Sequence, residues 1–419
     1  MNALPVDSPI AGARRQAALA FIFVTVLIDV LAFGVIIPVL PHLVQQFVGG
    51  SESSAAYWVG LFGSAFYLVQ FFAAPIQGAL SDRFGRRPVI LLSCLGLGID
   101  FIFMALAPSL AWLFVGRMIA AVTSASFTTA NAYVADVTGP ENRAKSFGMI
   151  GAAFGVGFVF GPLLGGVLGE IDLRLPFWVS AGLALLNFLY GLFVLPESLP
   201  KEKRSARFDW SHARPLGSAH LLRRYPAIWG LVAVVFLANF AHYVYPSTFV
   251  LFADVRYDWQ ERETGYVLFA VGILSAIVNA VLVGKLVKAL GERRTVLLGL
   301  GCGVVGFLVY AFAPYGWVFL LGLPVSALWG IAAPATQALI TRQVGAHEQG
   351  RIQGAVSGLV ALAGIGAPML FAGAFGFFVS PAAPVKLPGI AFLIAAVLLG
   401  SAWFVAWRYA RPAPVQAPG

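Results

Sequence analysis

The chain of 419 residues is 59% hydrophobic and only 11% charged, against roughly 25% charged residues in soluble domains. A soluble globular fold of this composition would aggregate, and the mean hydropathy of +0.86 also excludes one. The net charge of +9 does not indicate a nucleic-acid-binding protein, because Lys and Arg are scattered over short loops. Cys94 and Cys302 lie in separate apolar runs, so neither a disulfide framework nor a zinc site is expected.

Apolar runs of about 20 residues recur along the whole chain, each long enough to cross a hydrocarbon core of about 30 Å as a helix. The first run follows Arg14 and Arg15, but it is too long for a signal peptide, lacks a small-residue cleavage site and contains Asp29. We therefore predict an all-α membrane protein with twelve transmembrane helices. The predicted spans are 17–40, 57–80, 89–107, 111–134, 146–169, 176–195, 226–252, 263–286, 294–313, 316–340, 352–378 and 389–409.

Basic residues are distributed unequally between the two sets of predicted loops. With the N-terminus inside, 22 of the 27 Lys and Arg residues fall on the cytoplasmic side. This asymmetry follows the positive-inside rule and predicts that both termini are cytoplasmic. We expect a multi-pass protein of a bacterial-type inner (plasma) membrane.

The two halves of the chain repeat one another at a constant offset of 206 residues. The offset aligns Gly85 with Gly291, Arg87 with Arg293, and several further Gly and Pro residues at equivalent places in the predicted helices. Such a repeat predicts two parallel six-helix, pseudo-symmetric halves. The predicted domains are a first half at 1–196, a basic cytoplasmic linker at 197–226 that is rich in Pro and Gly, and a second half at 227–419.

Three ionisable side chains are predicted to lie well inside spans, and all three are in the first half: Asp29, Asp100 and Arg117. A charge at mid-membrane costs about 2.5–3.5 kcal/mol on insertion scales, so it is expected to be paired or functional. In the structural interpretation, Arg117 pairs with one acid and holds helices together. In the functional interpretation, two acids facing one base can hold either a proton or a cationic or polar substrate group. Burial favours the neutral form of a carboxyl group, whereas an adjacent Arg favours its charged form.

The loop between the second and third predicted spans reads "GALSDRFGRRP" (78–88). A basic loop can be merely a positive-inside turn, but an acid ahead of a Gly turn and three arginines also suits a charge-paired latch at helix ends. The loop resembles the signature loop of the major facilitator superfamily, and the match is complete. The resemblance implies gating of alternating access by packing on an acid at the end of span four, where "AYVADVT" supplies one. The implied gating residues are Gly78, Asp82, Arg83, Gly85, Arg86, Arg87 and Asp136.

Span five contains "GAAFGVGFVFGPLLGG" (151–166). In an apolar helix this run predicts close helix packing through small residues rather than a phosphate loop. It is similar to the antiporter motif of the same superfamily, which is associated with exporters more than importers. The matching residues are Gly157, Gly161, Pro162, Gly165 and Gly166.

Further motifs point to one branch of the superfamily. "LIDVLAFGVIIPVLP", "GRMIAA", "LPES" and "LGERR" together resemble the tetracycline/proton antiporters over essentially the whole chain. That branch carries residues matching Asp29, Asp100 and Arg117, and the resemblance implies a role for them in proton coupling. It also carries a His in span eight and an acid in span nine, where this chain has Ser275 and Gly303. These two departures argue against tetracycline itself as the substrate.

The second half is polar but uncharged at predicted membrane depth. Its polar side chains either bond helices together or line a substrate cavity, and His242 can titrate near neutral pH or serve as a hydrogen-bonded wall residue. The candidate substrate-binding residues are Asn239, His242, Tyr243, Ser275, Asn279 and Gln337, with Tyr245, Trp329 and Thr336 nearby. Aromatic side chains are abundant and would suit a planar amphipathic molecule.

The predicted function is a secondary transporter that exports a hydrophobic or amphipathic small molecule or drug in exchange for protons. One alternative is a proton symporter that imports a metabolite such as an organic acid, with Arg117 binding its carboxylate. Another is a transporter-like sensor or scaffold that moves nothing. No nucleotide loop, metal cluster or nucleophile triad predicts an enzyme, a cofactor or a metal site. The expected partners are the substrate, protons and the lipid bilayer, without nucleic acid, and the expected state is a monomer.

Overall fold

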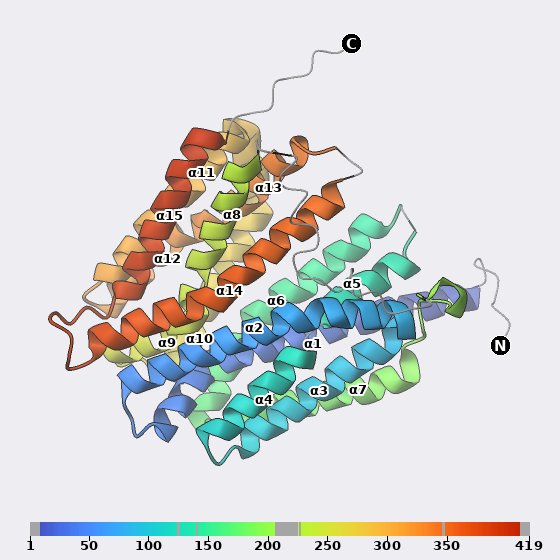
Figure 1. Cartoon of the computed structure of the whole chain (residues 1–419), viewed down its shortest axis with the longest axis horizontal. Coiled ribbons are helices and arrows are strands. Elements are labelled where there is room, and N and C mark those ends of the chain that lie inside the picture. Colours follow the sequence, from blue (N-terminus) through green and yellow to red (C-terminus); the bar gives the residue numbers. More distant parts are fainter. Residues whose placement is uncertain are drawn as a thin grey trace, which may run out of the picture. The chain divides into compact units, whose positions relative to one another are not determined.

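The computed structural model of the chain describes residues 9–123, 126–139, 141–205, 225, 228–345 and 348–410. Every regular element in these ranges is a helix (Figure 1), which confirms the predicted all-α class. The elements are α1 Pro9–Phe47, α2 Glu52–Phe84, α3 Arg86–Leu106, α4 Leu110–Thr123, α5 Ser126–Val137, α6 Arg143–Ile171, α7 Leu175–Val194, η1 Lys201–Lys203, α8 Trp229–His242, α9 Val244–Tyr257, α10 Glu261–Ile277, η4 Val278–Leu282, α11 Val283–Phe312, α12 Gly316–Ala327, η5 Leu328–Ile331, α13 Ala332–Arg342, α14 Gln349–Val379 and α15 Ile390–Tyr409.

The described residues contain 11 helical segments that are long and apolar enough to cross a membrane. One of these segments runs for 52 residues from Glu261 to Phe312. It contains Gly291, whose φ of 75° and ψ of 164° mark a kink where two helices meet. A helical membrane protein is therefore confirmed, whereas the count of twelve spans stays a prediction.

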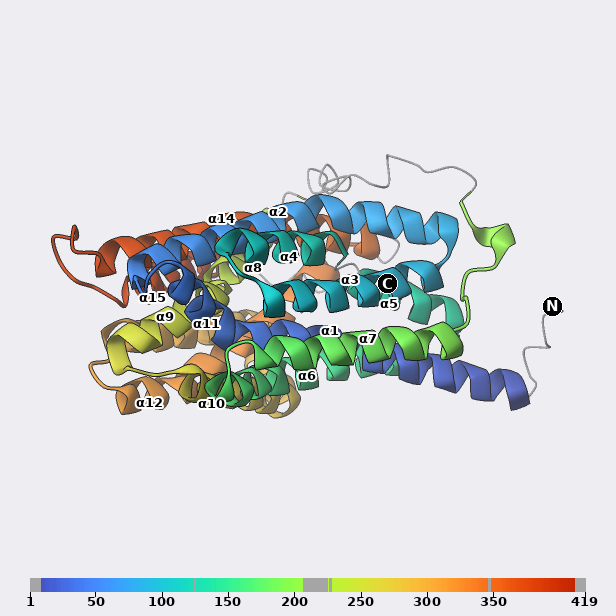
Figure 2. The same ribbon diagram turned by 90° about the horizontal axis from the view of Figure 1, so that it is seen from below.

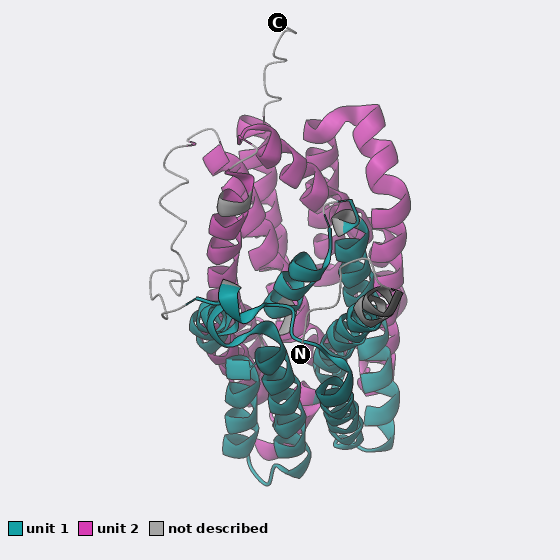
Figure 3. Cartoon of the chain, turned by 90° about the vertical axis from the view of Figure 1, so that its right-hand side faces the viewer, with its two compact units in different colours: residues 1–39, 69–215 teal, residues 40–68, 216–419 magenta. Residues whose placement is uncertain are grey.

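The helices form two compact units, drawn in different colours in Figure 3. Unit 1 contains residues 1–39 and 69–215, and unit 2 contains residues 40–68 and 216–419. Residues 40–68 thus lie in unit 2 although the sequence prediction assigned them to the first half. The reason is contact with α14: the Ser53 hydroxyl donates to the Gly376 carbonyl at 2.7 Å. A methyl group on Gly60 would approach Ala372 Cβ to 2.8 Å. The division at the predicted 197–226 linker stays a prediction, and residues 206–224 and 226 of that linker lie outside the described residues.

Unit 1 is organised around α3, which packs against α4, α5 and α7 (Figure 2). Its core gathers Phe21 of α1, Cys94 of α3 and Tyr133 of α5, all fully buried. Asn187 of α7 donates to the Thr25 hydroxyl at 3.1 Å, an interhelical hydrogen bond inside this apolar core. Cys94 is a free thiol, as the sequence predicted for a small core residue.

The core of unit 2 is aromatic and is organised around α11, which packs against α12, α13 and α15. The rings of Tyr310 and Phe319 stack with centroids 4.1 Å apart. The ring of Phe392 meets Tyr310 edge-on at 5.5 Å. Aromatic pairs of this kind stabilise packing beyond the area they bury.

The predicted internal repeat has structural counterparts in both units. Gly85 has a φ of 108° and its counterpart Gly291 has a φ of 75°, so both occupy the region that favours glycine. Arg87 donates to the Leu192 carbonyl of α7 at 2.7 Å. Arg293 donates to the Trp407 carbonyl of α15 at the same distance of 2.7 Å. In each half, the arginine two residues after this glycine therefore donates to a carbonyl near the end of another helix.

Candidate functional site

The structure brings together two of the three predicted membrane charges. Arg117 of α4 lies with one guanidinium nitrogen 3.6 Å from Asp100 Oδ2 of α3. Asp100 is fully buried, and Arg117 is only 7% exposed. A methyl group on Gly116 would approach Asp100 Oδ1 to 3.0 Å, so glycine at this position lets the two helices close on the carboxylate. The predicted pairing of Arg117 with one acid is present, in a buried site.

Asp29, the third predicted charge, is on α1. One of its carboxylate oxygens is buried. The carboxylate lies near enough to the Cys94 thiol of α3 to act on it electrostatically. The three charges therefore lie on α1, α3 and α4, all within unit 1. Their role in proton coupling stays a prediction.

Charged residues form a cluster around the loop between α2 and α3, which we call the latch cluster: Asp82, Arg86, Asp136 and Glu197. Arg86 lies 2.5 Å from Asp82 and donates to Asp136 of α5 at 3.2 Å. Glu197 accepts the Arg86 backbone N–H at 2.8 Å, at the first residue of α3, where the helix dipole favours a carboxylate. The loop therefore packs on the acid at the end of α5, as the sequence resemblance implied.

Sequence reasoning missed Glu197 as a member of this cluster. It lies in the quoted stretch "LPES", whose polar character directly after an apolar span was the available signal. Ser198 follows it and donates to Asp136 Oδ2 at 3.1 Å. Arg83, by contrast, was predicted as a gating residue but is exposed and lies over the Phe84 ring at 5.2 Å. Arg83 belongs to the last turn of α2, whereas Arg86 begins α3 after the turn at Gly85, so the two side chains are carried by different helices.

The two glycines of the loop motif differ in their surroundings, which predicts opposite results for the same substitution. A methyl group on Gly85 would approach Glu197 Oε2 to 2.1 Å, and the φ of 108° is unfavourable for alanine. A methyl group on Gly78 would meet nothing within 4 Å. We expect Gly85→Ala to lower the thermal stability and to disrupt the latch cluster, at a cost of about 1–3 kcal/mol, whereas Gly78→Ala leaves stability nearly unchanged. Thermal unfolding of the two purified variants checks this, and equal melting temperatures would contradict it.

The predicted antiporter motif forms a close contact between α6 and α1. Methyl groups on Gly157, Gly161 and Gly165 would approach the carbonyl oxygens of Leu27, Leu31 and Val35 to 2.9, 2.6 and 2.3 Å, respectively. The spacing of four residues on both helices gives one continuous stripe of backbone contact. Pro162 also belongs to this contact, because a methyl group on Gly34 would reach its ring at 2.8 Å. Gly166 is also buried, and its part in the contact with α1 stays a prediction. The packing interpretation of this glycine run is confirmed.

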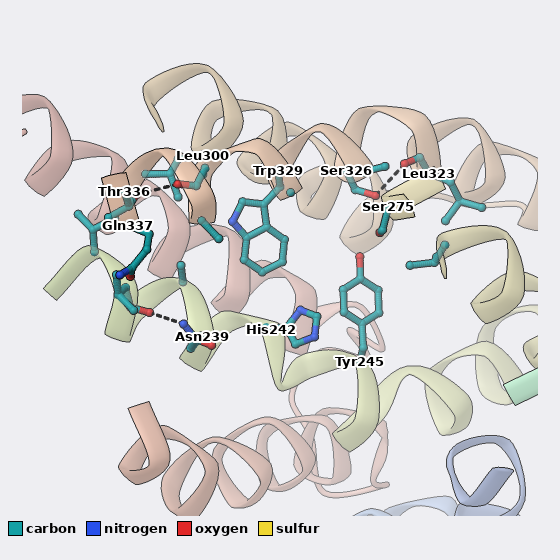
Figure 4. Close-up of a pocket in the computed structure, with 18 residues that line it drawn as sticks. Asn239, His242, Tyr245, Ser275, Leu300, Leu323, Ser326, Trp329, Thr336 and Gln337 are labelled. Carbon is teal, nitrogen blue, oxygen red and sulfur yellow. Dashed lines mark hydrogen bonds between the residues drawn. The ribbon is translucent and has the colours of Figure 1, made fainter. Parts of the chain in front are cut away.

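A cavity of about 360 Å³ lies within unit 2. Figure 4 shows Trp329 of η5 and His242 of α8 facing one another, with Gln337 and Asn239 toward one end and Tyr245 and Ser326 toward the other. The His242 and Trp329 ring centroids are 5.7 Å apart. No Asp, Glu, Lys or Arg is among the described residues that line this cavity.

The cavity contains four of the six predicted substrate-binding residues: Asn239, His242, Ser275 and Gln337. Tyr243 does not line it, because the neighbouring position on a helix points about 100° away. Its ring instead meets Tyr67 edge-on at 5.0 Å. Asn279 does not line it either; its amide donates to the Ser275 carbonyl at 2.9 Å within the π-helical turn η4. A substrate-binding role for all six residues stays a prediction.

Gly303 shapes this cavity although it does not line it. A methyl group on Gly303 would approach Trp329 Cγ to 3.0 Å and Leu399 Cδ1 to 2.7 Å. The absence of a side chain at this position therefore allows Trp329 to lie where it does. Ser326 is a lining residue that sequence reasoning missed; its hydroxyl pairs with Tyr310 at 2.5 Å. A polar residue two positions after Pro324 in an apolar helix was the available signal.

The comparisons with known proteins agree on one family. The sequence profile of the Major Facilitator Superfamily matches residues 22–368. Tetracycline resistance protein, class C, of Escherichia coli is 37% identical over 385 residues, which are 92% of this chain and 95% of that protein. Multidrug resistance protein 2 of Bacillus subtilis is 29% identical over 344 residues, 81% of this chain and 84% of that protein. The crystal structure of the human organic anion transporter MFSD10 (TETRAN) matches with a TM-score of 0.67 and 25% identity, covering 94% of this chain and 99% of the other. The chain therefore belongs to the major facilitator superfamily.

Proposed function

We propose that this protein is a secondary transporter that exports a planar, hydrophobic or amphipathic small molecule in exchange for protons. The observation that carries the proposal is the uncharged, aromatic cavity of unit 2, in a chain whose buried Asp100–Arg117 pair lies in unit 1. The proposal includes twelve transmembrane helices, cytoplasmic termini, a bacterial-type inner membrane and a monomeric state. Alternating access would expose the site to each side in turn.

The cavity has the size and lining expected of a small-molecule site. Its volume of about 360 Å³ falls in the range of ligand pockets, roughly 300–1,000 Å³. A planar ring would contact the faces of Trp329 and His242, and the Gln337 side chain can donate and accept hydrogen bonds at one end. No buried charge in the lining requires a charged substrate group. An uncharged or weakly polar aromatic molecule fits these properties best.

The buried pair in unit 1 supplies the chemistry for proton coupling. In a buried site, a carboxylate and an arginine attract one another as a pair. Protonation of the acid removes this attraction, and the guanidinium then forms other contacts. Binding or loss of one proton at Asp100 would thus change which contacts Arg117 makes. A change in helix contacts of this kind is what couples a proton to a conformational step.

The relatives named as tetracycline resistance proteins support export of a drug-like molecule. Tetracycline itself is a separate question. The residue that occupies the place of their span-nine acid, Gly303, is needed here to accommodate Trp329. We propose a substrate that stacks on this tryptophan, and tetracycline is one member of the panel that tests it.

The metabolite symporter is the less favoured alternative. It requires Arg117 to bind a substrate carboxylate, yet Arg117 already faces Asp100. The close α1–α6 contact at Gly161 also matches a motif associated with exporters. A non-transporting sensor would have no evident need for a buried pair in the membrane, because such a pair is costly to keep.

The proposal is tested in everted membrane vesicles that are energised to an acidic interior. Tetracyclines, cationic and neutral dyes, quinolones and phenicols are added one at a time while the interior pH is followed with a fluorescent amine. We expect a substrate to release protons from the vesicles and to accumulate inside them. Uptake into right-side-out proteoliposomes, driven by protons moving inward, would instead show symport and overturn the proposal.

Trp329→Ala gives the sharpest test of the cavity. We expect the apparent KM for planar substrates to rise about tenfold, because a lost aromatic contact costs about 0.5–1.5 kcal/mol beyond the area it buries. The matched control is Trp317→Ala, since Trp317 is 62% exposed and does not line the cavity. Equal changes in KM for both variants would show that the cavity does not bind the substrate.

A further inference from the structure

His42 is a buried histidine of α1 that the proposed transport site does not use. It belongs to the part of α1 that lies in unit 2. The residue is only 6% exposed. Its Nδ1 lies 2.7 Å from Glu261 Oε1 at the start of α10, and its Nε2 lies 3.9 Å from Asp254 Oδ2 of α9. One imidazole thus bridges two acids on two different helices.

The position of Glu261 favours its charged form. It is the first residue of α10, after the N-cap Gln260, in a capping box that Glu263 completes. The N-terminus of a helix carries a partial positive charge that stabilises a carboxylate. A charged carboxylate at hydrogen-bond distance favours the imidazolium form of histidine, in which both ring nitrogens donate.

The other charged groups around the cluster are also mainly acidic. Asp254 accepts a hydrogen bond from the Gln260 amide at 3.3 Å and one from Gln45. Glu52 of α2 and Asp258, which follows α9, act electrostatically on Asp254.

Two arginines on the same helices donate elsewhere. Arg256 of α9 donates to the Ala313 carbonyl at 3.2 Å. Arg262 of α10 donates to the Tyr266 hydroxyl at 3.2 Å. The two acids that lie within 4 Å of His42, Glu261 and Asp254, both place negative charge beside it.

We propose that His42, Glu261 and Asp254 form a second proton-binding site, which holds the end of α1 against α9 and α10 when His42 carries a proton. Histidine is the side chain that ordinarily changes charge between pH 5 and 8. Loss of the proton removes the positive charge between two acids, and the contact weakens. The positive charge of a protonated His42 lies between the two acids only while α1 contacts α9 and α10, so a rise in pH favours separation.

This inference rests on the proposed function, and it adds a direction to the exchange cycle. In the proposed topology this end of the helices faces the outside of the cell. Proton uptake from the outside would then favour closure of the outer end, which is the step that an exporter requires after it has released its substrate. The site acts on the conformational equilibrium and is separate from the Asp100–Arg117 pair.

The experiment measures the distance between two spin labels on the full-length protein in lipid nanodiscs, without substrate. The labels are attached at Ser54→Cys on α2 and Arg262→Cys on α10, both exposed positions, in a background in which Cys94 and Cys302 are replaced by alanine. We expect the ratio of the short-distance to the long-distance population to fall about tenfold from about pH 5 to about pH 8, within the range of coupling between protein sites. We expect His42→Gln to remove this pH dependence.

Two further variants keep the result interpretable. Glu261→Gln should weaken the pH dependence, even where His42→Gln fails to fold, because it removes the nearest acid. Glu263→Gln is the matched control, since it loses one charge in the same helix turn, is exposed and can still complete the capping box; it should behave as the parent does. A pH-independent parent, a His42→Gln variant with the parent's pH dependence, or a Glu263→Gln variant that loses it would each overturn the proposal. The labels report without substrate, so this failure is distinguishable from failure of the vesicle assay.

Discussion

Asp100→Asn is expected to abolish proton-driven transport and to destabilise the protein. The substitution leaves Arg117, only 7% exposed, facing an uncharged amide. Breaking a buried pair by removing one partner costs about 3–5 kcal/mol, because an uncompensated charge remains. Thermal unfolding of the purified variant measures the loss of stability, and the everted-vesicle assay measures substrate-dependent proton release.

The double variant Asp100→Asn/Arg117→Gln separates the two interpretations of this pair. Removing both charges takes away the pair as a whole, so a large part of the lost stability should recover. Transport should not recover, because no group remains to carry the proton. If transport recovered together with stability, the pair would only hold α3 and α4 together. Glu202→Gln is the matched control, since Glu202 is an exposed acid of η1 in the linker region.

The second large effect is expected for Gly161→Val at the contact between α6 and α1. Its first side-chain carbon would lie 2.6 Å from the Leu31 carbonyl oxygen and 2.8 Å from Gly34 Cα. These are backbone atoms, so no side-chain rotation relieves the clash and the two helices must separate. Overpacking of this kind typically lowers the free energy of unfolding by about 1–3 kcal/mol, and by more where the backbone must shift. We expect a lower melting temperature and loss of transport.

Gly155→Val is the matched control for that substitution. Gly155 lies on the same helix, and a methyl group there would meet nothing within 4 Å. Both substitutions place the same β-branched residue in α6, so intrinsic helix propensity affects them equally. A Gly155→Val variant as unstable as Gly161→Val would show that valine in this helix, and not the contact with α1, causes the loss.

Several features of the site could be predicted from local pattern. The pairing of Arg117 with an acid follows from the cost of an unpaired charge in an apolar span. The contact of Arg86 with Asp136 follows from a match to a family motif. The close packing at Gly161 follows from the four-residue spacing of small residues. In each case one short segment of chain contains the signal.

Other features could not be predicted because their causes lie in distant segments. Part of the reason that Gly85 must be glycine is Glu197, which lies more than 100 positions further along the chain. The absence of Tyr243 from the cavity depends on the direction of one residue at the end of α8, where it meets Tyr67. Nothing beside His42 in the sequence indicates that two acids from α9 and α10 will surround it.

The sequence by itself determined the membrane character, the helical class, the internal repeat and the family of this protein. These properties depend on composition, on the length of apolar runs and on short motifs, all of which are local or periodic. The tertiary structure decided which polar side chains share a cavity, which glycines lie against backbone and which acids face His42. Those outcomes depend on the direction of each side chain and on contacts between helices far apart in the chain, and hydrophobic periodicity does not specify either.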